Sequence, residues 1–214
     1  NKDYWSASWQ PVGKGLETYK SECRHGMGYT KMVADYSDIH SEALYYVPLD
    51  KSYEIWNLTL TNQSDSVREL AITGYAEFTN QNNYEEDQVN LQYSQFITRT
   101  EFRKNRIAQM IHGNLDGLKE GEAIDNKIVI ERFFGLAGAE VSSYCGDKEK
   151  FIGRYHGYGN PVGVINGDLG NGLNYNENGC GALCTTMTLQ PGESKSIAFV
   201  LGMKYDAEAE EIMN

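Results

Sequence analysis

The sequence predicts an all-β protein: a large antiparallel β-sandwich with long loops and almost no helix. Apolar and polar residues alternate along several short segments, most clearly over 67–79, where Leu70, Ile72 and Phe78 share one face. Such alternation is typical of half-buried strands. Polar turn clusters separate these segments at short intervals, which favours antiparallel pairing because parallel strands need long crossovers. The sequence has no internal repeat of the length found in propellers or solenoids.

The first half of the chain predicts an aromatic arm followed by four strands. Residues 1–18 combine Trp5, Trp9 and Pro11, a pattern that fits an edge strand or an ordered arm. Period-two patterns then predict the strands, each ended by a polar turn or a proline. These strands run from Gly28 to Tyr36, from His40 to Val47, through Trp56 to Leu60, and over 67–79.

The second half mixes strand patterns with long polar or glycine-rich segments. We expect a polar, acidic loop over 80–89, a charged surface excursion over 114–127 and a long glycine- and asparagine-rich loop over 151–181. The predicted strands cover 91–102, 128–136, 139–144, Leu183–Leu189 and Ile197–Leu201. Residues 1–205 therefore form the predicted sandwich domain, and 206–214 predict the start of a helical linker.

The charge of the chain excludes several classes of partner. Its 19 basic and 30 acidic residues give a net charge of -11. Nucleic-acid binders need a basic face, and anionic membranes attract basic segments, so neither partner is expected. No apolar run is long enough for a transmembrane helix. The composition fits a neutral ligand and a cytoplasmic location.

The cysteines predict neither a disulfide framework nor a metal site. Cys23, Cys145, Cys180 and Cys184 are sparse and irregularly spaced, which favours reduced thiols. Cys180 and Cys184 could supply two metal ligands, but no second pair has suitable spacing. We therefore expect no metal.

A catalytic carboxylate pair is one interpretation of the acidic loop. Glu85 and Asp87 would point the same way on an extended chain, about 6.5 Å apart. Inverting glycosidases use a similar separation, but their carboxylates flank the scissile bond and one lies in an apolar pocket. Adjacent acids in a polar loop more often form a solvated face, so no catalytic residue is predicted in this chain.

The stretch from Tyr19 to Thr30 is the strongest candidate for a functional site. It crowds Glu22, Arg24 and His25 together before Gly26 and Gly28, and predicts a polar, sharply bent entry to a strand. Arg24 could bind a ligand, or it could form a structural ion pair that pins a turn. Tyrosines and asparagines in the loops suit either a sugar or a protein interface.

Several long motifs resemble the N-terminal domain of glycoside hydrolase family 94. The similar segments are Tyr4–Val12, Glu22–Thr30 and Tyr46–Leu49. Within that family, four further segments resemble cellodextrin phosphorylases more than cellobiose phosphorylases; they are Asn82–Tyr93, Phe134–Gly138, Cys145–Asp147 and Phe151–Gly153.

The resemblance implies a galactose-mutarotase-like β-supersandwich, followed by a helical linker and an (α/α)6 barrel. The implied reaction is inverting phosphorolysis, in which inorganic phosphate attacks the anomeric carbon of a β-1,4-glucan end and releases glucose 1-phosphate. The implied general acid is an aspartate of the barrel, so this segment alone should be inactive. No cofactor is implied besides phosphate as co-substrate.

The resemblance also implies a homodimer in which the sandwich of one subunit abuts the barrel of its partner and completes the substrate cleft. Arg24 and His25, or Asn82, Tyr84 and Glu85 of the acidic loop, are the residues we expect at that contact. The alternatives are a purely structural dimerisation domain of a cellobiose, laminaribiose or chitobiose phosphorylase, and a stand-alone carbohydrate-binding module.

Overall fold

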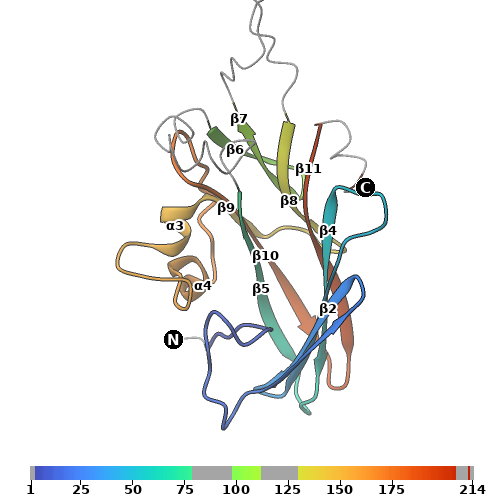
Figure 1. Ribbon diagram of the computed structural model, residues 1–214. Helices are drawn as coiled ribbons and strands as arrows, with labels where there is room; N and C mark the ends of the chain where they lie inside the picture. The colour runs from blue at the N-terminus through green and yellow to red at the C-terminus, as the bar shows by residue number, and fades with distance from the viewer. Residues whose placement is uncertain (1–2, 79–97, 112–129, 206–211, 213–214) are drawn as a thin grey trace, which may run out of the picture.

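The computed structural model describes residues 3–78, 98–111, 130–205 and 212. They form two antiparallel sheets that face each other, with two short helices beside the smaller sheet (Figure 1). The larger sheet has the strand order β1-β2-β3-β4-β11-β8-β7-β6, and the smaller has the order β5-β10-β9. The predicted all-β antiparallel fold class is confirmed.

The strands of the larger sheet are β1 (Lys20–Gly26), β2 (Tyr29–Tyr36), β3 (Ile39–Tyr46), β4 (Tyr53–Asn62), β6 (Thr98–Arg103), β7 (Arg106–Ile111), β8 (Ile130–Ala137) and β11 (Ser194–Tyr205). Those of the smaller sheet are β5 (Arg68–Glu77), β9 (Ser143–Asp147) and β10 (Gly179–Leu189).

The main core fills the space between the two sheets. Phe134 of β8 stacks on Phe199 of β11 with ring centroids 5.4 Å apart, and Trp56 of β4 lies 5.1 Å from the Phe134 ring. Leu183 of β10 and Ile72 of β5 close this core from the smaller sheet. We call the face of the larger sheet that points into this core its inner face, and the opposite face its outer face.

Tight turns hold the hairpins where the sequence predicts them. Ser37 and Asp38 join β2 to β3 with φ angles of 51° and 57°, the pair of positive values that a type I′ hairpin turn requires. Gly192 turns the chain from β10 into β11 with a φ of 73°.

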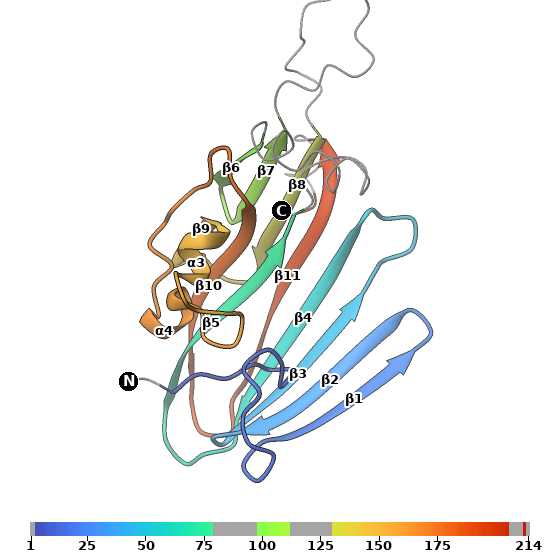
Figure 2. The ribbon, with the colours of Figure 1, turned by 60° about the vertical axis from the view of Figure 1, so that its left-hand side comes forward.

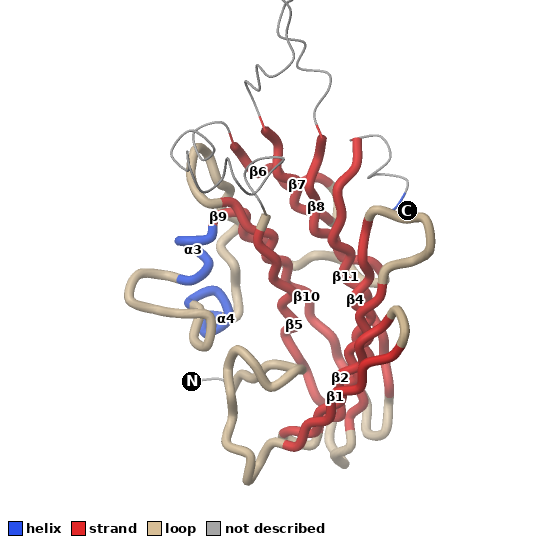
Figure 3. Tube along the Cα trace, in the orientation of Figure 1, coloured by secondary structure: helices blue, strands red, loops and turns tan. Residues whose placement is uncertain are grey.

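The predicted long loop over 151–181 is partly wrong, because it contains short helices (Figure 3). The helix α3 (Lys148–Ile152) enters this segment, and its N-cap Asp147 accepts a hydrogen bond from the Lys150 amide at 3.1 Å. The helix α4 (Val162–Asn166) ends at Gly167 in a left-handed conformation. Phe151 anchors α3 in a second core cluster with Cys145, Cys180 and Cys184.

Three strand predictions also need correction. Residues 20–26 form a full strand, β1, instead of a bent entry; β9 covers 143–147 instead of 139–144; and β7 was not predicted. The ordered-arm alternative for the N-terminus is confirmed, since residues 3–19 contain no strand and Trp5 packs 5.3 Å from the Tyr36 ring.

Of the predicted helical segment 206–214, only Ile212 lies among the described residues. It packs against Tyr53, Phe133 and Val200 on the outer face of the larger sheet. The helical linker therefore stays a prediction. Within the described residues, no helix is long and apolar enough to cross a membrane.

Candidate functional site

The hairpin of β1 and β2 forms one rim of the larger sheet (Figure 2). All seven residues of β1 are exposed, and the strand pairs with β2 alone. Met27 and Gly28 make the turn, where Gly28 has a φ of 88°. At its neighbour Gly26, a Cβ would lie 2.1 Å from the exposed Tyr29 ring, so a larger residue there would displace this ring. The predicted site is thus an exposed projection of the sheet.

Arg24 lies on the outer face of this hairpin. Cross-strand register aligns it with Lys31 of β2, which aligns with Leu44 of β3. Its guanidinium pairs with the Glu22 carboxylate at 2.5 Å, and both side chains are more than half exposed. This hydrogen bond and the nearby positive charge lower the pKa of Glu22. The predicted ion pair is present, but an exposed pair adds little stability.

His25 lies on the opposite, inner face. Cross-strand register aligns His25 with Thr30 of β2, which aligns with Tyr45 of β3. Tyr45 in turn aligns with Trp56 of β4, and Trp56 packs on the core. His25 Nδ1 is 3.0 Å from Thr30 Oγ1, and its Nε2 is 3.5 Å from Cys23 Sγ. Arg24 and His25 are neighbours in sequence, yet the strand directs their side chains to opposite faces.

Apolar side chains cover the end of the sheet at this hairpin. Met27 is fully exposed at the turn, and Leu49 is 91% exposed in the loop between β3 and β4. Tyr29 and Val47 are also exposed, and both loops lie at the same end of the sheet (Figure 2). We call Arg24, His25, Met27, Tyr29, Val47 and Leu49 the hairpin tip. Exposed apolar side chains gathered in this way are typical of a contact surface.

The other predicted residues, Asn82, Tyr84 and Glu85, lie outside the described residues, as does Asp87. Cys180 and Cys184, the candidate metal pair, are buried in the second core cluster. Across the described ranges, no group of three or more His, Cys, Asp or Glu side chains is placed to hold a metal.

A second polar site, which the sequence did not predict, lies beside α3. Glu77 at the end of β5 accepts hydrogen bonds from the Tyr158 hydroxyl at 2.6 Å, the Tyr75 hydroxyl at 2.9 Å and the Lys148 ammonium at 2.8 Å. We call Tyr75, Glu77, Lys148 and Tyr158 the Tyr158 cluster. Burial raises the pKa of Glu77, but the hydrogen bonds from Lys148, Tyr158 and Tyr75 outweigh it, so the pKa is lowered.

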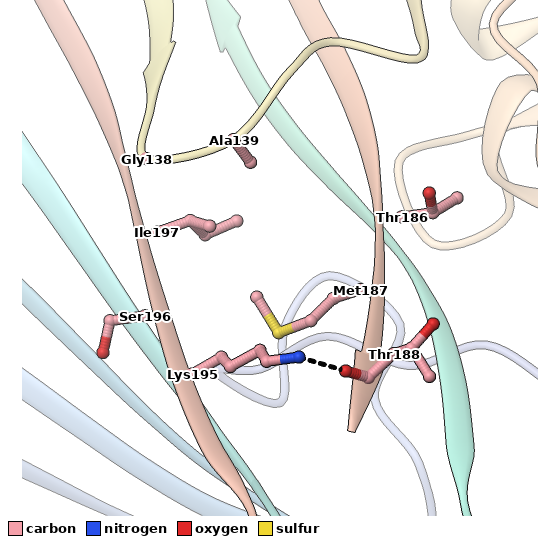
Figure 4. Close-up of a pocket in the computed structure, with 8 residues that line it drawn as sticks. All are labelled: Gly138, Ala139, Thr186, Met187, Thr188, Lys195, Ser196 and Ile197. Atoms are coloured by element: carbon pink, nitrogen blue, oxygen red, sulfur yellow. Dashed lines mark hydrogen bonds between the residues drawn. The ribbon is translucent and has the colours of Figure 1, made fainter. Parts of the chain in front are cut away.

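A groove of about 340 Å³ opens between β10, β11 and the loop after β8 (Figure 4). Lys195 is the charged residue of its lining, and its ammonium donates to the Thr188 carbonyl at 2.7 Å and pairs with Glu193 at 3.2 Å. The other lining residues are small or apolar, such as Met187 and Ile197. The lining contains no carboxylate, the group that glycosidases use as general acid.

The chain belongs to the supersandwich domain family of glycosyl hydrolase family 94, whose model matches residues 1–214. It is 34% identical over 202 residues to an N,N'-diacetylchitobiose phosphorylase of Vibrio proteolyticus, and 32% identical over 201 residues to that of Vibrio furnissii. Each alignment covers 94% of this chain and 24% of the relative. A solabiose phosphorylase of Paenibacillus borealis is 28% identical, over 89% of this chain and 23% of its own length.

The chain thus spans about a quarter of the length of these curated relatives. Among solved structures it resembles a polysaccharide lyase, with 14% identity and a TM-score of 0.46 over 85% of this chain and 23% of the lyase. It also resembles an Escherichia coli K12 protein provisionally named an aldose 1-epimerase, with 10% identity and a TM-score of 0.40 over 87% of this chain and 69% of that one. The family assignment depends on the sequence matches.

Proposed function

We propose that this chain is the supersandwich domain of a glycoside phosphorylase that cleaves a β-linked oligosaccharide with inorganic phosphate. The match of the whole chain to the family model carries this proposal, together with the phosphorylase names of its relatives. The reaction needs no cofactor besides phosphate. Four free cysteines, three of them buried, are consistent with a reducing, cytoplasmic location.

In this proposal the domain is not itself catalytic. The groove between β10 and β11 lacks a carboxylate, and Arg24 is paired with Glu22 on an exposed edge. The hairpin tip instead suits a contact with another part of the enzyme, because its apolar residues are exposed and β1 and β2 present part of it on a paired hairpin. We propose that this contact is with the barrel of the partner in a homodimer, where the tip completes the substrate cleft.

The identity of the sugar has two candidates. The motifs over Asn82–Tyr93 and Phe134–Gly138 favour a cellodextrin, whereas the chitobiose phosphorylases among the relatives favour N,N'-diacetylchitobiose. We propose the cellodextrin as substrate and retain chitobiose as the second candidate.

A phosphorolysis assay of the full-length enzyme tests the proposal. The enzyme is incubated with phosphate and either cellotetraose or N,N'-diacetylchitobiose, and the released sugar 1-phosphate is quantified. We expect α-glucose 1-phosphate from cellotetraose. If sugar 1-phosphate is released from chitobiose alone, the proposed substrate is wrong, but the proposed phosphorylase activity stands. Hydrolysis without phosphate dependence, or no reaction with any β-linked glucan or chitin oligosaccharide, would contradict the proposal.

A further inference from the structure

We propose that the Tyr158 cluster is a carbohydrate-binding site, separate from the hairpin tip, that takes a pyranose ring of a glucan or chitin chain. The choice of these two sugars rests on the proposed function, whereas the site itself is argued from its geometry. The loop between α3 and α4 carries Tyr158 and lies on the opposite side of the molecule from the β1–β2 turn (Figures 1 and 2).

The ring of Tyr158 has three neighbouring partners, and the residue is nevertheless 48% exposed. Its hydroxyl donates to Glu77 at 2.6 Å, its centroid lies 5.4 Å from the Lys148 ammonium, and its ring is tilted against Tyr75 at 6.2 Å. Tyr75 is itself fixed, since it stacks on the buried Phe151 at 4.6 Å. A fixed, exposed ring provides the surface on which the C–H face of a sugar packs with little loss of entropy.

Polar groups for sugar hydroxyls adjoin this ring. The Glu77 and Lys148 side chains are 39% and 29% exposed, so both reach solvent while bonded to each other. A carboxylate can accept about four hydrogen bonds, and Glu77 receives three here; an ammonium has three N–H groups. Both residues can therefore bond a hydroxyl without breaking the cluster.

The loop that carries Tyr158 is shaped in advance of any ligand. His156 Nδ1 lies 2.7 Å from the Asn160 carbonyl oxygen, and the Gly157 amide donates to the Asn160 side chain at 2.8 Å. Tyr155 has a φ of 61° and a fully exposed ring. A bulky residue rarely adopts this backbone conformation, and strained backbone conformations are more frequent at functional sites.

These observations favour a sugar over a protein partner. In sequence, polar residues and glycines separate or flank the exposed tyrosines of the loop, namely Arg154, His156, Gly157 and Gly159, whereas the centre of a protein interface is depleted of charged residues. Ring faces interleaved with hydrogen-bonding groups match the alternating C–H and hydroxyl surfaces of a pyranose.

Native affinity electrophoresis of the full-length enzyme tests this site. The wild type and the variants Tyr158→Ala and Tyr155→Ala are run in gels that contain hydroxyethylcellulose or glycol chitin. We expect at least one polymer to retard the wild type, and each substitution to weaken the apparent affinity about fivefold or more. Tyr155→Ala removes no contact that holds the fold, because the Tyr155 ring is fully exposed. The matched control is Tyr175→Ala, an exposed tyrosine outside the loop between α3 and α4, and it should bind as the wild type does.

The site is contradicted if neither polymer retards the wild type, or if the variants are retarded as strongly as the wild type, which would place binding elsewhere. It is also contradicted if Tyr155→Ala or Tyr158→Ala changes the molecular mass measured by light scattering, since the loop would then be a protein interface. Phosphorolysis of cellotetraose and of N,N'-diacetylchitobiose is measured on the same samples. If the variants phosphorolyse sugar and are retarded as strongly as the wild type, this site alone is overturned. If the gels retard the wild type but it shows no phosphorolysis, the proposed function alone is overturned.

Discussion

Neighbouring residues in the hairpin tip have different surroundings, and this limits what each can do. Arg24 lies beside Lys31 on the outer face, whereas His25 lies beside Thr30 on the inner face. A ligand or partner that approaches one face therefore meets only one of the two side chains. The sequence analysis predicted that Arg24 and His25 lie at the same contact. Given the strand geometry, a partner must either surround the edge of the sheet and touch both side chains or bind one face and touch one of them.

At the same scale, His40 predicts a pH dependence of stability. A hydrogen bond that His40 Nδ1 donates to the Asp35 carboxylate at 2.7 Å raises the pKa of His40, burial lowers it, and the contact with Glu42 raises it further. The folded state therefore holds this proton more tightly than the unfolded chain does. The resulting stabilisation is complete below about pH 6.5 and is lost as the pH rises through the raised folded pKa.

We expect the free energy of unfolding of His40→Gln to equal that of the wild type at pH 8 and to fall below it at pH 5.5, by less than about 1 kcal/mol because the cluster is near the surface. Urea denaturation at the two pH values measures this difference. A gap between the two proteins that does not depend on pH would show that the proton on His40 contributes nothing.

Individual elements differ in how well the sequence predicted them. In β3, in β5 and at the end of β10, more buried and less buried side chains alternate, so the strand pattern is visible in the sequence. In β1 all side chains are exposed, and the alternation that marks a strand is absent. In β7 the buried residues include Arg106 and Gln109, which a polarity pattern places outside.

Local sequence patterns are also insufficient to predict the Tyr158 cluster. Glu77 and Lys148 are 71 positions apart, and Tyr158 is further still. They meet because β5 and β9 both pair with β10, which brings the end of β5 next to the start of α3. Non-local pairing of this kind leaves no local signal. The one indication of this site in the sequence was the pair of polar residues Tyr75 and Glu77, which share one face of β5.

Close packing between the sheets predicts a cost for enlarging Gly181 of β10. A Cβ at this position would lie 2.5 Å from the Phe134 Cβ, which cannot move without shifting β8. We expect Gly181→Ala to lower the free energy of unfolding by about 1–3 kcal/mol. Thr186→Ala, at an exposed position of the same strand, should stay within about 0.5 kcal/mol of the wild type in the same urea titration. An equal loss for both variants would contradict the packing argument.

At the scale of the whole molecule, the sandwich holds two candidate surfaces on opposite sides of one core. The larger sheet ends at the hairpin tip, and the smaller sheet supports the Tyr158 cluster through Phe151 and Tyr75. Under the two proposals, one surface would contact the cleft of the enzyme and the other would bind sugar away from it. The domain would then contribute to catalysis without supplying the acid.

The most direct test of this account compares Arg24→Ala with Lys20→Ala in the full-length enzyme. Lys20 lies on the same face of the same exposed strand, at the end away from the tip. The account predicts that Arg24→Ala lowers kcat/KM for phosphorolysis by about tenfold or more at an unchanged melting temperature, whereas Lys20→Ala changes neither. Equal activity in both variants, or a loss in Arg24→Ala that follows its melting temperature, would contradict it and assign the Glu22–Arg24 pair a purely structural role.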